Sequence, residues 1–190
     1  MKGVSRARSI LLTALSVEVA VLVVTGIALY FLYVPADFQA WGDDGGVRLA
    51  FGLRLLHRFA SYVALPTSVA AGVLVALREG VRVRRWTGVA LGVGLAVMAA
   101  AASVTGFLLP WDQLALWAVT IGTSLRGYTV LFDPAVRFVL VGGAELETST
   151  VIWWLVVHAL VLGPALVALV VVAWRRHRRA TRPRPTGDPA

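Results

Sequence analysis

The stretch TGFLLPWDQLALWAVT, residues 105–120, marks the point where a long apolar run ends and a tryptophan-rich, half-polar segment begins. The run before the break, from Trp86 to Leu109, is long enough to cross a bilayer, which takes about 20 helical residues. Gly106 lies just before the Pro110–Trp111 corner that ends the run. Because glycine weakens a helix by about 1 kcal/mol relative to alanine, its presence there indicates a packing requirement.

Three further apolar stretches of similar length raise the number of predicted membrane spans to four. They run from Ile10 to Val34, from Leu49 to Leu77 and from Thr150 to Trp174. The first is too long for a cleaved signal peptide, and YFLYVP does not resemble a small-residue cleavage site. A chain that is 58% hydrophobic and 15% charged is too apolar for a soluble domain. Because helices satisfy their own backbone in lipid, we expect an all-α fold, a transmembrane four-helix bundle.

The charged residues are distributed unequally between the two ends of this predicted bundle. Thirteen of the 18 basic residues lie on one side: Lys2, Arg6, Arg8, Arg78, Arg82, Arg84, Arg85, Arg175, Arg176, Arg178, Arg179, Arg182 and Arg184. Seven of the ten acids lie in the opposite loops: Asp37, Asp43, Asp44, Asp112, Asp133, Glu145 and Glu147. The positive-inside rule then places both termini in the cytoplasm and the loops 35–48 and 110–149 outside, in the cytoplasmic (inner) membrane. The net charge of +8 is thereby explained without a nucleic-acid partner.

The spans divide the chain into three predicted parts. Residues 1–9 form a basic cytoplasmic N-terminus, residues 10–175 the four-helix domain, and residues 176–190 a polar, proline-rich tail expected to be disordered. Short surface helices are expected between the third and fourth spans. This loop is the expected docking surface, although its aromatic residues also fit a plain interfacial belt: Trp111, Trp117, Tyr128 and Phe132.

Ionisable side chains inside membrane helices are hypotheses of function, and only a few occur here: Glu18, Arg54, His57, Arg58 and His158. His57 and His158 each lie about nine residues inside the outer end of their span, about 13 Å along the helix axis. The two histidines are therefore expected at matching depth. The third histidine, His177, lies within RRHRR and is interpreted as solvated charge.

Two glycines occupy the same outer half of the bundle, Gly26 in the first span and Gly106 in the third. Two histidines on one diagonal of a bundle and two glycines on the other predict a pocket for a flat macrocycle whose metal is bound from both faces. Arg54, one turn before His57, is placed to meet haem propionates. Taken singly, each histidine also fits a hydrogen bond between helices, and glycine is common in membrane helices.

Four segments together resemble cytochrome b. TGFLLPWDQLALW resembles the end of its third helix, and RLLHRFAS resembles the second-helix segment with the outer haem ligand, especially in chloroplast-type relatives. VVTGIALYFLYVP and VGGAELETSTVIWWLVVHAL resemble the end of the first helix and the start of the fourth. The resemblance covers residues 10–175. It implies that His57 and His158 bind the outer haem, with Gly26 and Gly106 as its glycines and Arg54 as the propionate-binding arginine.

The sequence departs from the family where a second, inner haem would bind. The expected ligand positions, about fourteen residues beyond His57 and His158, hold Ala71 and Val172. Leu12 replaces the inner glycine of the first helix, and only Gly92 remains of that pair. We therefore expect one b haem with two histidine ligands.

Other departures concern the surroundings of the haem and the quinone. The arginine that usually precedes the fourth-helix ligand is absent, with Trp153 and Trp154 in that region, and Pro164 is displaced. The family's C-terminal half, with its quinone loop, does not follow the fourth span, so a complete outer quinone site is not expected here.

These features predict an electron-transfer subunit of an oxidoreductase complex rather than an enzyme on its own. It would pass electrons between membrane quinone and an extracytoplasmic partner in a hetero-oligomer, such as an iron–sulfur subunit, a molybdenum enzyme or a hydrogenase. The alternative is a haem-free anchor or assembly scaffold with a degenerate cytochrome b fold. Three interpretations of Glu18 stay open: it transfers protons to a quinone, it bonds to a partner subunit, or it is a neutral buried acid without a role. The last of these is favoured.

Overall fold

A computed structural model of the chain describes residues 2–32, 45–77, 82–110, 114–115, 117–119 and 148–181. Three long helices come first: α1 (Lys2–Leu32), α2 (Gly45–Ala76) and α3 (Arg82–Leu108). The fourth rod is continuous but composite. It consists of α6 (Thr148–Leu155), the π-helix η1 (Val156–Leu162) and α7 (Gly163–Thr181).

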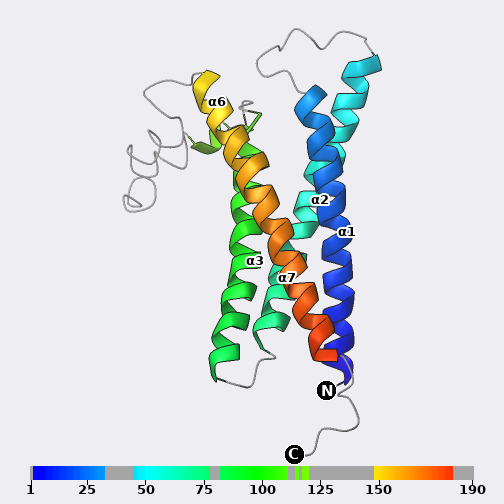
Figure 1. Cartoon of the computed structure of the whole chain (residues 1–190). Coiled ribbons are helices and arrows are strands. Elements are labelled where there is room, and N and C mark those ends of the chain that lie inside the picture. Colours follow the sequence, from blue (N-terminus) through cyan, green and yellow to red (C-terminus); the bar gives the residue numbers. More distant parts are fainter. Residues whose placement is uncertain are drawn as a thin grey trace, which may run out of the picture.

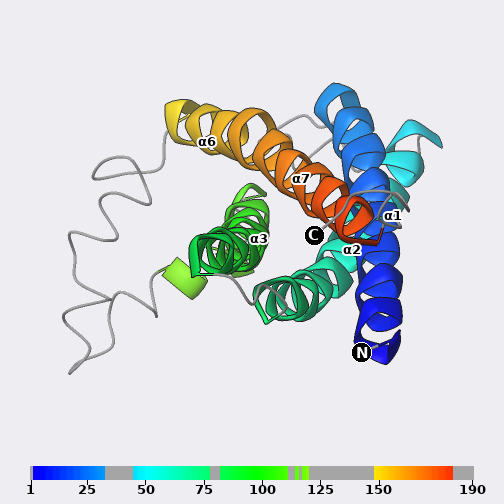
Figure 2. The ribbon, with the colours of Figure 1, turned by 60° about the horizontal axis from the view of Figure 1, so that its bottom comes forward.

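The four rods run alternately up and down and form a bundle (Figures 1 and 2). α2 packs against both α1 and α3, and the fourth rod contacts α3 and α1. α2 and the fourth rod are therefore diagonal to each other, as are α1 and α3. Each rod is long and apolar enough to cross a membrane, over Gly3–Leu32, Phe51–Ala76, Trp86–Leu108 and Ser149–Thr181. The predicted all-α fold with four spans is confirmed.

Two details at the edges of the bundle bear on the predictions. α7 continues through Thr181, so residues 176–181 of the predicted tail are helical, and 182–190 lie outside the described residues. The short surface helices expected between the third and fourth spans fall mostly outside the described residues too. Of the aromatic residues predicted there, Trp117 is described and 64% exposed.

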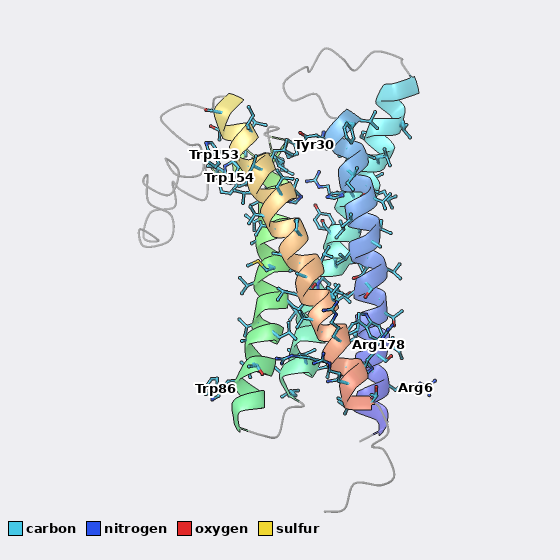
Figure 3. All side chains as sticks on the ribbon, viewed as in Figure 1. Arg6, Tyr30, Trp86, Trp153, Trp154 and Arg178 are labelled. Atoms are coloured by element: carbon cyan, nitrogen blue, oxygen red, sulfur yellow. The ribbon has the colours of Figure 1, made fainter. Side chains whose placement is uncertain are left out.

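The outward faces of the rods are apolar, and amphipathic aromatic side chains stand near both ends (Figure 3). Trp86 is exposed at the end that also holds Arg6 and Arg178, and Tyr30 and Trp153 are exposed near the other end. Tryptophan and tyrosine collect at the two membrane–water interfaces. The bundle therefore has the surface of a multi-pass membrane protein with an arginine-rich end. That this end faces the cytoplasm remains a prediction from the charge distribution.

The larger of the two hydrophobic clusters among the described residues lies in the half of the bundle nearer this arginine-rich end. Its buried members are Leu12, Leu15, Val19, Ala71, Val75, Leu91, Leu95, Ala99, Leu166, Val170 and Ala173. All four rods contribute, and most of the side chains are small or branched apolar ones. The core therefore brings the rods together without any polar group among these residues.

Within this half, α2 and α3 approach each other at two facing glycines. A Cβ atom added to Gly72 would meet the backbone carbonyl oxygen of Gly92, and one added to Gly92 would meet that of Gly72. Small residues at such a crossing let two backbones touch, which is a main source of packing energy between helices in lipid. The close approach of α2 and α3 thus depends on both glycines.

We expect Gly92→Ala to destabilise the bundle by about 1–3 kcal/mol, because a backbone atom in the way cannot move without separating the helices. Thermal unfolding of the detergent-solubilised protein measures this. Gly52→Ala is the matched control, since nothing lies within 4 Å of its added Cβ. Equal unfolding temperatures for the two variants would contradict the close crossing.

At the arginine-rich end, polar contacts join α1 to α7. Arg8 donates from Nε to Nδ1 of His177 at 3.0 Å, and its Nη2 lies 2.7 Å from the same nitrogen. Trp174 donates from Nε1 to the Ser16 hydroxyl at 2.7 Å. His177 is only 6% exposed, so its interpretation as solvated charge is wrong. The helical repeat of α7 places it on the same face as the core residues Val170 and Ala173, and there it accepts hydrogen bonds from Arg8.

Candidate cofactor site

Two histidines face each other in the half of the bundle away from the arginine-rich end. His57 comes from α2 and His158 from η1, which lie on one diagonal of the bundle. Their ring centroids are 6.2 Å apart, and the ring planes are inclined at 65°. Both side chains are half-buried. The structure thus brings together the two residues that the sequence placed at matching depth.

The other diagonal supplies a hydrogen-bond partner for each imidazole. The Thr25 hydroxyl of α1 lies 2.8 Å from Nδ1 of His57, and the Thr105 hydroxyl of α3 lies 2.9 Å from Nδ1 of His158. Both threonines are buried, with 4% and 6% exposure. The sequence analysis missed them. The signal was present, because each threonine belongs to a Val-Thr-Gly triplet, at 24–26 and at 104–106.

The glycine that follows each threonine leaves space for the same imidazole. A Cβ atom added to Gly26 would lie 3.3 Å from Cε1 of His57, and one added to Gly106 would lie 2.8 Å from Cε1 of His158. In this structure, then, Gly106 before the Pro-Trp corner accommodates a histidine of the neighbouring rod. That Gly26 and Gly106 also leave space for the edge of a macrocycle remains a prediction.

His158 lies in the only part of the described chain that forms a π-helix, Val156–Leu162. The Gly163 N–H bonds to the His158 carbonyl, five residues earlier. The next residue, Pro164, has no N–H to donate and its ring would crowd a regular helical turn before it, which favours a widened turn here. The π-helical turn contains one residue more than an α-helical turn, and this shifts by one residue which side chains of α7 face the core. Val172 is 42% exposed, whereas Ala173 is buried and faces the core.

Two arginines, Arg54 and Arg58, lie near His57 on α2, and the contacts described here are those of Arg58. Arg54 is half-buried on α2, one turn before His57, and its role toward propionates stays a prediction. Arg58 donates from Nε to the Tyr62 hydroxyl at 2.9 Å. Its guanidinium carbon lies 5.7 Å from the ring centroid of Phe107, the neighbour of Gly106. Arg58 therefore links α2 to α3 beside the histidine pair.

Glu18 lies away from the histidines, between α1 and α2. It is half-buried and accepts a hydrogen bond from the Thr67 hydroxyl at 3.1 Å. Its other carboxyl oxygen is buried and has no hydrogen-bond partner among the described residues. The structure thus gives Glu18 a neighbour on α2 but does not bring it to the candidate site.

The distance between the two histidine rings is compatible with a shared metal ion. Imidazole–metal bonds of about 2 Å on either side put the centroids of two opposed rings about 6 Å apart, close to the 6.2 Å observed. No group of three or more histidine, cysteine or acidic side chains capable of holding a metal occurs among the described residues. Two histidines suit a metal whose remaining ligands come from a macrocycle, as in haem.

Comparison with known proteins shows the family to which the chain belongs. The family described as "Cytochrome b(N-terminal)/b6/petB" matches residues 75–188. Cytochrome b6 from Tupiella akineta is 30% identical over 155 residues, which are 80% of this chain and 72% of that protein. The chain therefore belongs to the cytochrome b family of haem-binding, multi-pass membrane proteins that serve as electron-transfer subunits.

Proposed function

We propose that this chain is a membrane cytochrome b subunit with one b haem, held between His57 and His158 in the outer half of the bilayer. The observation that carries the proposal is the histidine pair itself, on opposed rods with ring centroids 6.2 Å apart. Gly26, Gly106 and Arg54 belong to this site, the arginine as partner of a propionate. A haem with two histidine ligands has no open coordination position, so its chemistry is electron transfer.

The packing of the other half of the bundle supports one haem rather than two. Ala71 is fully buried where the family would carry a second α2 ligand, and Ala173 is the buried residue at the corresponding level of α7. Leu12 is also fully buried in this core. Neither alanine can ligate a metal, and side chains of all four rods occupy the space between them.

A single haem in the outer half of the membrane determines the partners we propose. With no second haem, the chain has no electron path to the arginine-rich end, so exchange takes place at the opposite end. Electrons would pass between membrane quinone and an extracytoplasmic redox subunit of the same hetero-oligomer. An iron–sulfur protein, a molybdenum enzyme or a hydrogenase fits this role, and the loop between α3 and α6 is the proposed docking surface.

Haem stoichiometry tests the proposal directly. We expect the pyridine haemochrome of the purified protein to give one b haem per chain, and the reduced protein to show the sharp α band of a six-coordinate haem. Two haems per chain would overturn the assignment of a single site. A well-folded protein without haem would instead support the anchor or scaffold that the sequence left open.

A further inference from the structure

We infer that a groove between α1 and α7 binds one anionic phospholipid from the leaflet at the arginine-rich end of the bundle. The groove has a volume of about 570 Å³, within the range of pockets that hold small ligands. Its lining residues come from α1 and α7, whose lower parts lie side by side (Figure 1). No histidine is among them, so the inference goes beyond the proposed electron transfer and does not depend on haem.

The floor of the groove belongs to the hydrophobic core, and its rims face the lipid. Val19 and Val170 on the floor are buried core residues, whereas Val24 and Val171 on the rims are 68% and 42% exposed. The lining residues of α7 extend over 167–178, which corresponds to about 16 Å along the helix axis. This is about half of the ~30 Å hydrocarbon core, the depth of one leaflet. The groove therefore has the lining and the length to take an acyl chain from one leaflet.

Two arginines of α7 line the groove at the arginine-rich end. Arg175 and Arg178 are both exposed, and the guanidinium carbon of Arg178 lies 5.4 Å from the ring centroid of Trp174. Stacking on an indole uses the face of a guanidinium group and leaves the N–H groups at its edge to donate. These N–H groups match the oxygens of a phosphate, which they can bind in pairs. The end of the groove thus suits a phosphate group.

The described part of the chain supplies no carboxylate to neutralise these two arginines. Glu18 is the only acidic residue within the described ranges. It lies between α1 and α2, accepts a hydrogen bond from Thr67 and does not line the groove. Two positive charges beside an apolar groove therefore favour a ligand that brings its own negative charge.

Trp174 gives this end of the groove a defined shape. Its Nε1 donates to the Ser16 hydroxyl at 2.7 Å, and that hydroxyl donates to the Leu12 carbonyl, also at 2.7 Å. The indole N–H and the hydroxyl proton are thus both used within the protein. The indole presents an apolar ring to the groove, and the arginines are the charged groups that line it. The polar part of the ligand is therefore expected to be an anion.

The combination of valines and arginines selects the class of ligand. Inorganic phosphate would pair with the arginines and leave the valines uncovered. A quinone or another uncharged amphiphile would cover the valines and leave the two guanidinium groups without an anion. A phospholipid of net negative charge satisfies both. The charge distribution assigns this end of the bundle to the cytoplasm, and anionic lipids of the cytoplasmic leaflet bind basic pockets between membrane helices.

Thermal unfolding of the delipidated, full-length protein in detergent, titrated with phosphatidylglycerol, tests the inference. We expect a saturable rise in unfolding temperature, because the bound lipid bridges α1 and α7. The apparent affinity should fall about 5-fold in Arg175→Gln and in Arg178→Gln, and about 25-fold in the double variant. Ala20→Phe should also weaken binding, although both arginines remain, because its ring would occupy the groove from an exposed position.

Two matched controls keep charge and ring size constant. Arg6→Gln removes another exposed arginine at the same end, one that does not line the groove (Figure 3). Ala100→Phe places the same ring at an exposed position of α3. Both controls should bind phosphatidylglycerol like the wild-type protein. Haem content per folded chain should be the same in all variants, because none of these residues lies at the histidine pair.

Several outcomes would overturn the inference without touching the proposed function. Equal losses of affinity in Arg6→Gln and Arg178→Gln would show a general attraction to the basic end. Equal affinity for phosphatidylcholine with the same acyl chains would refute the anionic headgroup, and an equal effect of inorganic phosphate would refute the acyl chain. Wild-type affinity in Ala20→Phe would place the lipid elsewhere. A quinone that displaces phosphatidylglycerol at lower concentration would identify a different occupant.

Discussion

His57→Ala and His158→Ala are each expected to abolish haem binding, with a loss of the reduced α band and of the pyridine haemochrome signal. Each substitution would remove one of the two proposed ligands, and no group of three or more histidine, cysteine or acidic side chains that could hold a metal occurs among the described residues. The remaining histidine would face an open position. Five-coordinate haem held by one histidine would bind weakly and would show a changed spectrum.

The third histidine provides a matched control for this experiment. His177 is also buried, but it lies at the arginine-rich end and accepts hydrogen bonds from Arg8. We expect His177→Ala to lower the unfolding temperature, because Arg8 loses a buried acceptor, and to leave the haem content per folded chain unchanged. External imidazole should partly restore haem to His57→Ala, by filling the space of the missing ring.

Full haem occupancy with an unchanged spectrum in either alanine variant would contradict the assignment of the ligands. Loss of haem in all three variants would point to general instability of the bundle rather than to a specific role of the pair. The comparison therefore separates ligation from folding, which a single substitution could not do.

The fold and the histidine pair were predictable from the sequence because both depend on lengths along a helix, which follow from counting residues. Span length follows from the bilayer thickness, and depth follows from the rise per residue, so equal counts placed His57 and His158 at one level. The same helical repeat continues past Trp174, because α7 extends to Thr181. Buried Leu166, Val170 and Ala173 set a helical repeat on whose core face His177 falls, whereas its charged neighbours suggested solvent exposure.

Other features depend on contacts between rods, which spacing alone does not determine. The partnership of Thr25 with His57 requires knowing that α1 and α2 are neighbours and how each is rotated about its axis. The Val-Thr-Gly triplet occurs twice in the sequence, at 24–26 and 104–106. The sequence does not show that each threonine lies beside a histidine of another rod, which only the structure reveals. The π-turn at His158 changed the register of α7 by one residue, so that Ala173, and not Val172, faces the core.

Gly106→Ala is expected to reduce haem occupancy strongly, by about 10-fold or more, as disturbed ligand orientation does at other metal sites. The added Cβ would lie 2.8 Å from Cε1 of His158, closer than carbon atoms approach one another. The imidazole cannot simply rotate away, because Thr105 holds its Nδ1 at 2.9 Å. Either the hydrogen bond would break or the fourth rod would move outward, and both changes would displace the imidazole from the proposed haem.

Gly26→Ala is the matched variant for comparison, because its added Cβ would lie 3.3 Å from Cε1 of the other histidine, His57. A shift of a few tenths of an ångström relieves that contact, so we expect this variant to keep most of its haem. Haem content per folded chain, measured for both variants by pyridine haemochrome, tests the difference. If both glycines mainly cleared the edges of the macrocycle, the two alanine variants should lose haem equally. Unequal losses, with Gly106→Ala the worse, would show that the imidazole of the neighbouring rod is what each glycine accommodates.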